Sequence, residues 1–436
     1  MAAQSTAARP GIRALLYSHD TFGLGHLRRA RTIAAALTKA LPGGSALIVT
    51  GSPVAGRFDF ADRVDHVRLP GVVKHADGSY TASNLSLDID AMARLRGAVI
   101  EAAAREFEPD LLIVDKEPWG FRHEMAETLS ALRARGTRIV LGIRDVLDEE
   151  DALAREWERK GAIEAIERFY DEIWVYGLPA LCRPLSGLGL SPRMEARTVY
   201  TGYLRRDLDD GLLEPDDGPE EPFVLVTTGG GGDGAMLIAW VIRAFETEAA
   251  AGRAPGRAGA AAVPRTAAVS GAAALPRAHI VYGPFLDAGL RADFDDRLAR
   301  LGGRVTAIGF TTRLEALMAR AAGVVAMGGY NTFCEILSAD RPAIIVPRTQ
   351  PRREQLLRAA AAERLGLVTM LTPVRDGAEA AVMAQALADL ATRPAPSAAA
   401  AEAHLGDGLL GGLMGGLDAV VARTHALAAP LAAAGE

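Results

Sequence analysis

The chain has 436 residues, which is enough for about two to three domains, each with its own hydrophobic core. Its 48 basic and 54 acidic residues give a net charge of -6, which excludes the strong positive field of a general nucleic-acid-binding protein. Two cysteines without a CxxC pattern exclude a disulfide framework and a cysteine zinc cluster, and no uncharged apolar run reaches the roughly 20 residues of a membrane-spanning helix. Since no signal-peptide pattern is present either, we expect a cytoplasmic protein.

The first half of the chain alternates strand-like and helix-like segments. An apolar run over 12–18 precedes a loop over 19–26 and an amphipathic helical pattern over 27–40. Further strand-like runs lie at 46–50, 111–115, 138–143 and 172–176, and helical patterns lie at 91–107, 124–135 and 151–169. Strands that alternate with helices predict a parallel sheet with crossover helices.

The same pattern begins again after an acidic segment. Residues 202–221 are rich in Asp, Glu, Pro and Gly and lack an apolar period, which is typical of an interdomain linker. A strand-like run over 223–228, a Gly-rich loop over 229–234 and a helical pattern over 235–248 follow. The sequence therefore predicts two similar α/β domains, over 1–201 and 222–400.

Two further segments stand apart from this alternation. Residues 252–277 form a low-complexity Ala, Gly, Pro and Arg stretch, which we interpret as a surface insertion in the second domain. Residues 401–436 are a helical segment rich in Ala, Leu and Gly, and we expect it to pack back on the first domain.

The loop over 229–234 has five glycines in six residues and fits the pattern GxGxxG between a strand and a helix. Exposed N–H groups at such a helix start suit a pyrophosphate. The alternative is a tight turn that needs glycines, but five glycines in six residues exceed what a turn requires. No acidic residue lies between Glu248 and Asp287, where a dinucleotide site needs one for the ribose, and the lysine of a P-loop is missing. A nicotinamide-dependent enzyme is therefore disfavoured.

The segment over 326–335 carries the most specific pattern. Two glycines follow an apolar run, Asn331 or Thr332 is placed to cap the next helix, and Glu335 lies three residues after Thr332. Such a loop offers a hydroxyl and amides to a phosphate, and a carboxylate to a pair of sugar hydroxyls. The alternative is a plain helix start, with Cys334 as a small buried side chain.

Three ordered segments, over 226–234, 305–337 and 341–359, resemble the nucleotide-sugar-binding half of GT-B glycosyltransferases, especially the MurG-type, family 28-like enzymes that use UDP-GlcNAc. The resemblance covers about residues 223–370. In the first half it depends on the loop at 23–26 and the strand that ends at Asp115. It implies an α/β fold of two Rossmann-like domains that face each other across a cleft, with the donor on the second domain and the acceptor on the first.

The resemblance also implies a role for each residue of the donor site. The glycine loop receives the diphosphate, two apolar side chains flank the nucleobase, a threonine contacts phosphate, a glutamate binds the ribose hydroxyls, and a Glu-Gln pair reads the sugar. These residues are Gly230, Gly231, Gly232, Phe310, Leu314, Gly329, Thr332, Glu335, Glu354 and Gln355. Relatives often have Gln-Gln or Asp-Gln at the last pair and an Asn where Arg358 stands, so the identity of the sugar stays open.

In the first domain, the resemblance assigns His26 as the base that deprotonates the acceptor and Asp115 as the carboxylate that orients it. Histidine titrates near neutrality, and strand ends in such sheets converge on the ligand. A purely structural His26 and a competing base at His19 remain as alternatives. The acceptor-binding residues implied are Gly23, Gly25 and Arg28. The arginines at 28, 29 and 31 either attract a phosphate-bearing acceptor or solvate an exposed helix face, and we favour the solvated interpretation.

Together these features predict an inverting glycosyltransferase without a cofactor. Its partners would be a nucleoside-diphosphate sugar and a glycan, lipid-linked or small-molecule acceptor, with peripheral contact to the inner face of the cell membrane. Three Asp-x-Asp strings occur, at 88–90, 207–209 and 293–295, but none ends a predicted strand, so no metal is assigned. The alternatives are a nucleotide-sugar epimerase or hydrolase, and a non-catalytic nucleotide-sugar-binding protein of polysaccharide assembly.

Overall fold

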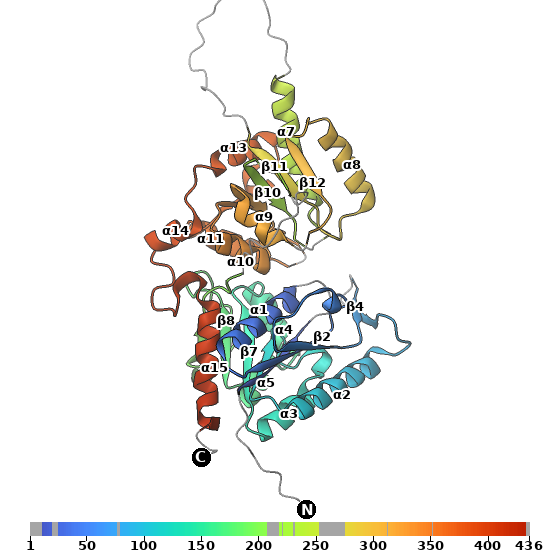
Figure 1. Cartoon of the computed structure of the whole chain (residues 1–436), viewed down its shortest axis with the longest axis vertical. Helices are drawn as coiled ribbons and strands as arrows, with labels where there is room; N and C mark the ends of the chain where they lie inside the picture. The colour runs from blue at the N-terminus through green and yellow to red at the C-terminus, as the bar shows by residue number, and fades with distance from the viewer. Residues whose placement is uncertain are drawn as a thin grey trace, which may run out of the picture. The chain divides into compact units, whose positions relative to one another are not determined.

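The computed structural model describes residues 11–19, 25–75, 79–206, 218–219, 221–229, 232–252, 275–311, 313–350 and 352–432. The chain forms two compact units, Met1–Arg205 with His404–Glu436, and Arg206–Ala403. Each unit is built on a parallel sheet with helices around it (Figure 1). Within the described ranges, no helix has the length and apolar character needed to cross a membrane.

The sheet of the first unit has the strand order β3-β2-β1-β6-β7-β8-β9, and all its pairings are parallel. The strands are β1 (Arg13–Ser18), β2 (Ser45–Thr50), β3 (Val64–Arg68), β6 (Leu111–Asp115), β7 (Arg138–Arg144), β8 (Glu172–Tyr176) and β9 (Thr198–Tyr200). The strand order reverses between β1 and β6. In open parallel sheets ligands bind beyond the carboxyl ends of the strands at such a switch point, so a ligand site is expected at the ends of β1 and β6.

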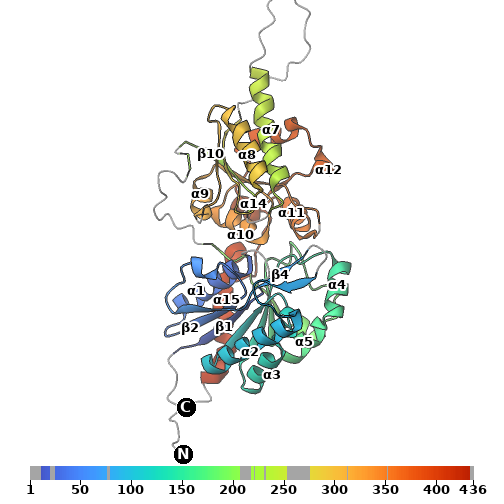
Figure 2. The ribbon, with the colours of Figure 1, turned by 90° about the vertical axis from the view of Figure 1, so that its right-hand side faces the viewer.

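Helices cover both faces of this sheet, with α1 beside α15 and α2 beside α3 (Figure 2). The helices are α1 (Gly25–Ala40), α2 (Ile89–Phe107), α3 (Ala126–Ala134), α4 (Glu150–Arg159), α5 (Ala162–Phe169), α6 (Pro192–Glu195) and α15 (Gly416–Ala432), with 3₁₀ turns at Ala55–Arg57, Phe121–His123 and Gly412–Met414 and a hairpin of β4 (Val72–Lys74) and β5 (Tyr80–Ala82). Because the central strands are buried on both faces, they read as continuous apolar runs such as LLIVD.

The C-terminal helix belongs to the first unit. Arg423 on α15 forms an ion pair with Glu172 on β8, and Arg138 on β7 donates from Nε to the carbonyl oxygen of Leu427 at 3.2 Å. The chain therefore crosses from the second unit back to the first before it ends.

The second unit repeats the architecture with the strand order β12-β11-β10-β13-β14-β15. Its strands are β10 (Phe223–Thr227), β11 (Arg277–Val281), β12 (Val305–Ile308), β13 (Gly323–Ala326), β14 (Ala343–Ile345) and β15 (Thr369–Met370). Its helices are α7 (Ala235–Gly252), α8 (Ala288–Ala299), α9 (Leu314–Arg320), α10 (Tyr330–Ala339), α11 (Glu354–Arg364), α12 (Pro373–Asp376), α13 (Ala380–Leu390) and α14 (Pro396–Glu402). The order reverses between β10 and β13, so the second switch point lies at the ends of those two strands.

The prediction of an α/β fold with two Rossmann-like domains is confirmed, but some elements differ from the expectation. The single helix expected over 151–169 is two helices, α4 and α5, because Gly161 adopts a left-handed conformation with φ 60° between them. The short strands β3, β9 and β15 and the β4–β5 hairpin were not predicted, since they lack a long apolar run. Most of the expected linker and insertion, at 207–217 and 253–274, lies outside the described residues.

Candidate active site

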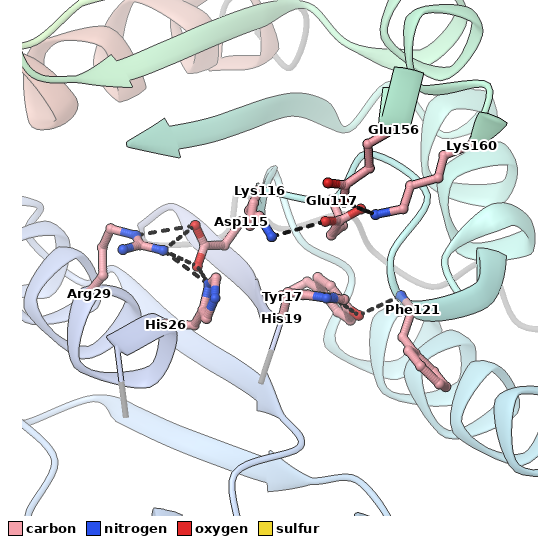
Figure 3. A network of polar contacts seen from close by, with 10 residues as sticks. All are labelled: Tyr17, His19, His26, Arg29, Asp115, Lys116, Glu117, Phe121, Glu156 and Lys160. Carbon is pink, nitrogen blue, oxygen red and sulfur yellow. Dashed lines mark hydrogen bonds and ion pairs between the residues drawn. The ribbon is translucent and has the colours of Figure 1, made fainter. Parts of the chain in front are cut away.

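His26 and Asp115 lie together at the switch point of the first unit. His26 is in the first turn of α1, and Asp115 is the last residue of β6, which pairs with β1. The Nδ1 atom of His26 is 2.6 Å from Oδ2 of Asp115 (Figure 3). The imidazole keeps about 20% of its side-chain surface exposed, so it remains accessible to a ligand.

Arg29, one helical turn after His26, completes this cluster. Its side chain is only 2% exposed, and its NH2 group donates to Oδ1 and Oδ2 of Asp115 at 2.7 and 2.6 Å. The same NH2 group lies 3.1 Å from Nδ1 of His26. Our prediction that this arginine solvates an exposed face was wrong, because the side chain is buried against the carboxylate. The spacing of three residues could have revealed this contact, because it puts Arg29 on the same face of α1 as His26.

The charge on Asp115 decides which nitrogen of His26 carries the proton. Burial alone would raise the pKa of Asp115, but the charge of Arg29 and the contact with His26 hold it well below its usual range. An ionised carboxylate only accepts hydrogen bonds, so Nδ1 of His26 donates to it. The neutral imidazole then has its lone pair on Nε2, which is the form that a general base needs.

His19, the alternative base, and the nearby Glu117 are poorly suited to take a proton. Burial lowers the pKa of His19 to about 3, although the nearby carboxylate of Glu117 opposes this shift. Burial would raise the pKa of Glu117, but Lys116, His19 and Lys160 hold it well below its usual range. The Nζ atom of Lys160 lies 2.8 Å from Oε2 of Glu117. A group with so low a pKa is a weak base near neutral pH.

A buried ion pair supports the loop that follows Asp115. Arg96 donates from Nε to Oε2 of Glu124 at 2.6 Å, and the hydroxyl of Tyr17 donates to Oε1 at 2.6 Å. The backbone N–H of Phe121 donates in turn to the Tyr17 hydroxyl at 3.0 Å. This network fixes the loop at the ends of β1 and β6, and no sequence motif predicted it.

The other acceptor-side residues lie near the start of α1. Gly25 is its first residue, and Arg28 is partly buried, with its carbonyl oxygen accepting a hydrogen bond from Oγ1 of Thr32 at 3.0 Å. Arg31 points elsewhere, since its guanidinium lies over the rings of Phe58 and Phe60. Gly23 lies outside the described residues.

In the second unit, the Gly-rich loop adjoins the start of α10. Gly229 has φ 69°, and a Cβ added to it would lie 3.6 Å from Oγ1 of Thr332. Gly232 is close to the carbonyl oxygen of Phe285, which a Cβ would approach to 3.2 Å. Gly230 and Gly231 lie outside the described residues. The loop after β10 and the helix after β13 thus meet at the second switch point.

The start of helix α10 is not capped by the side chain that we expected. Gly329 is the residue at the N-cap, and no side chain caps the helix, so the prediction that Asn331 or Thr332 caps it was wrong. Asn331 instead accepts a hydrogen bond from Arg206 at 2.7 Å. Thr332 is 9% exposed and Glu335 is fully buried, so a ribose would reach Glu335 only after neighbouring side chains move.

Glu354 and Gln355 begin α11 and are held by Arg348, which the sequence analysis did not single out. Arg348 donates to Oε1 of Glu354 at 2.5 Å and to Oδ2 of Asp233 at 3.1 Å, and its backbone N–H donates to Oε1 of Gln355 at 3.0 Å. A Cβ on Gly329 would lie 3.9 Å from Nε2 of Gln355. The Gly-rich loop and the start of α11 are therefore linked through one arginine.

The two apolar residues of the expected donor site, and Arg358, differ in exposure. Phe310 is 53% exposed and offers a ring face, whereas Leu314 is 9% exposed at the start of α9. Arg358 is buried on α11, and its NH1 group donates to the carbonyl oxygen of Gly328 at 3.2 Å. An arginine at this position therefore supports the turn before α10.

The Asp-x-Asp strings within the described ranges have structural partners. Asp88 caps α2, Asp90 forms an ion pair with Arg122, and Asp295 accepts a hydrogen bond from the hydroxyl of Tyr282. Where the structure describes the chain, no group of three or more His, Cys, Asp or Glu side chains is placed to hold a metal ion. The string at 207–209 lies outside the described residues.

Comparisons with known proteins agree with this architecture. Residues 279–404 match the glycosyltransferase family 28 C-terminal domain, which confirms the resemblance seen in the sequence. A comparison with curated protein sequences finds no match.

Solved glycosyltransferases share the fold over nearly the whole chain. The glycosyltransferase of kitacinnamycin aligns with a TM-score of 0.60 and 16% identity, covering 96% of this chain and 100% of that one. UGT2 of Phytolacca americana, solved with UDP-2-fluoro-glucose and pterostilbene, aligns with a TM-score of 0.60 and 13% identity, covering 96% and 100%. VinC, solved with dTDP, aligns with a TM-score of 0.52 and 17% identity, covering 97% and 99%. Residues 279–404 thus match a glycosyltransferase family 28 C-terminal domain, and the chain as a whole has the two-unit fold of solved glycosyltransferases.

Proposed function

We propose that the protein transfers a sugar from a nucleoside-diphosphate sugar to a hydroxyl of its acceptor, with inversion at the anomeric carbon and with His26 as the base. The observation that carries this proposal is the contact of 2.6 Å between Nδ1 of His26 and the carboxylate of Asp115. It supports a proton-accepting Nε2 at the carboxyl edge of a Rossmann-like sheet, where such folds bind ligands.

The reaction proceeds as one displacement. Nε2 of His26 takes the proton of the acceptor hydroxyl while that oxygen attacks the anomeric carbon of the donor. The bond between the anomeric carbon and the diphosphate oxygen breaks, and its electron pair leaves with the nucleoside diphosphate. Asp115 stabilises the imidazolium that forms, because the carboxylate is ionised and already accepts its Nδ1 proton.

The donor belongs to the second unit in this proposal. Backbone N–H groups of the Gly-rich loop and the start of α7 at Ala235 meet the charge of the diphosphate, without a cofactor or a metal ion. Thr332 contacts phosphate, Glu335 the ribose and Phe310 the base. UDP is the first nucleotide to test, because UGT2 was solved with a UDP sugar, and dTDP is the second, because VinC was solved with it.

The acceptor side of the proposal is broader. A glycan, a lipid-linked sugar or a small molecule offers the required hydroxyl, and we place the reaction in cell-envelope or polysaccharide synthesis, in the cytoplasm or at the inner face of the membrane. Arg28 beside His26, together with Gly23 and Gly25, is proposed to contact the acceptor.

The test measures nucleoside diphosphate released from UDP, dTDP and GDP sugars, with and without a panel of acceptors. Acceptor-dependent release and a product of inverted anomeric configuration by NMR are expected, with activity retained in excess EDTA. His26→Ala should lower turnover by about two to four decades while UDP affinity stays within a few-fold. Release without an acceptor would favour a hydrolase, and donor binding without any release would favour a binding protein.

A further inference from the structure

Besides His26 and Asp115, the cluster at the end of β6 contains a third charged group, the guanidinium of Arg29. The guanidinium of Arg29 contacts both oxygens of Asp115 through NH2, and its Nε donates to Oδ1 at 3.2 Å. Burying an arginine is costly unless it is paired and hydrogen-bonded, so this placement needs a reason beyond solvation of the helix.

We propose that Arg29 is a positioning residue for His26: it holds the carboxylate of Asp115 against Nδ1 and balances the charge of that carboxylate beside the imidazole. This inference goes beyond the proposed role of His26 and rests on it. A carboxylate with two acceptor oxygens can rotate about its last bond, and the arginine contacts at both oxygens prevent this.

The charge balance has a consequence with a definite sign. A carboxylate beside an imidazole favours the protonated form of the ring. Arg29 adds a positive charge 3.1 Å from Nδ1, which opposes protonation of the imidazole. Arg29 therefore offsets the charge of Asp115 at the imidazole.

Other charged groups around His26 come from several elements. The ring of His19, after β1, lies 5.9 Å from that of His26 and is held neutral by its low pKa. Lys116, Glu117 and Lys160 act on His19, and their charges are largely matched by ion pairs at 3.2 and 2.8 Å. Tyr176 on β8 is near Asp115 and Arg29, and burial raises its pKa, so it stays neutral as well. Asp115 and Arg29 are therefore the charges that dominate at His26.

The experiment follows the titration of His26 by NMR in the full-length protein without ligands, with the eight histidines isotopically labelled and His26 assigned by its loss in His26→Gln. Arg29→Met should raise the midpoint of the His26 titration by about one to two pH units relative to wild type. The acidic limb of the pH–rate profile should move to higher pH by the same amount, because turnover needs the neutral imidazole.

Two matched variants separate charge from geometry. Arg29→Lys keeps the charge but lacks the fork that spans both oxygens, so the midpoint should stay near wild type while turnover falls by about ten- to a hundredfold. Lys39→Met removes the same charge from the exposed end of α1 and should change neither quantity.

A folded Arg29→Met protein with an unmoved His26 midpoint would overturn the inference and leave Arg29 a structural residue. If Arg29→Met does not fold, the double variant Arg29→Met/Asp115→Asn replaces it, because it leaves neither buried charge without its partner. The His26 midpoint in the double variant should lie above the His26 midpoint in Asp115→Asn alone. Equal His26 midpoints in these two variants would also overturn the inference. The titration needs no substrate, so it is separate from the test of the proposed function. Full turnover in His26→Ala would refute the role of His26 as the base, whether or not substitution of Arg29 moves the titration.

Discussion

Replacing Asp115 by Asn is expected to lower turnover by about two to four decades, because it changes the tautomer of His26. The asparagine has one amide oxygen, and the guanidinium of Arg29, which only donates, would take it at the place where it now contacts Oδ1 at 2.7 Å. The amide nitrogen would then face Nδ1 of His26 and donate to it. An imidazole that accepts at Nδ1 carries its proton on Nε2 and cannot take one from the acceptor.

The magnitude has two parts. A hydrogen bond between charged partners contributes about 1.5 to 3 kcal/mol, and the one at 2.6 Å between His26 and Asp115 gains its full charge only when the imidazolium forms in the transition state. At about 1.4 kcal/mol per decade this loss is about one to two decades. The unfavourable tautomer accounts for the remaining loss of turnover, since only a minor population of the neutral imidazole still carries its proton on Nδ1.

The assay is release of nucleoside diphosphate in a single turnover at saturating donor and acceptor, with UDP affinity measured by calorimetry. Asp110→Asn is a matched control, because Asp110 precedes the opposite end of β6 and accepts a hydrogen bond from the backbone N–H of Arg13 at 2.8 Å. A folded Asp115→Asn protein that keeps more than about a tenth of wild-type turnover, while chemistry limits the rate, would refute the tautomer argument.

Three further outcomes are expected. Glu335→Gln should weaken UDP binding by about 10- to 100-fold through loss of charge-assisted bonds to the ribose, and calorimetry that finds unchanged affinity removes Glu335 from the site. Glu124→Gln should lower the free energy of unfolding in urea by about 3 kcal/mol, because it leaves the buried Arg96 uncompensated; a loss below 1 kcal/mol would contradict this. Since the folded pKa of His19 is lowered to about 3, the unfolded chain binds the extra proton below about pH 6.5, so stability falls on acidification by about 2 kcal/mol at pH 5; His19→Gln should flatten this pH dependence in urea titrations.

Much of the fold could be predicted from the sequence because its central strands are buried on both faces. Runs such as LLIVD at β6 and RIVLGIR at β7 have no polar face, and each is followed by a helical period, which together indicate a parallel sheet. The short strands at the sheet edges, β3, β9 and β15, have partly exposed residues and no such run. These edge strands are defined by their pairing with a neighbouring strand, which is a property of the tertiary structure.

The candidate site divides in the same way. Sequence patterns were enough to place His26 after a Gly-rich loop at a helix start and Asp115 at the end of a buried strand. Both positions map to the carboxyl edge of one sheet, because parallel strands with crossovers put all such ends together. The repeated architecture of the second unit was also predictable from these patterns. By contrast, the burial of Arg29 against Asp115 and the link from Asp233 to Glu354 through Arg348 are visible only in the folded chain. Helical spacing specifies which residues of α1 share a face, but Asp115, the partner of Arg29, lies 86 residues away in the chain. Asp233, the partner of Arg348, lies 115 residues away, and no local pattern encodes either contact.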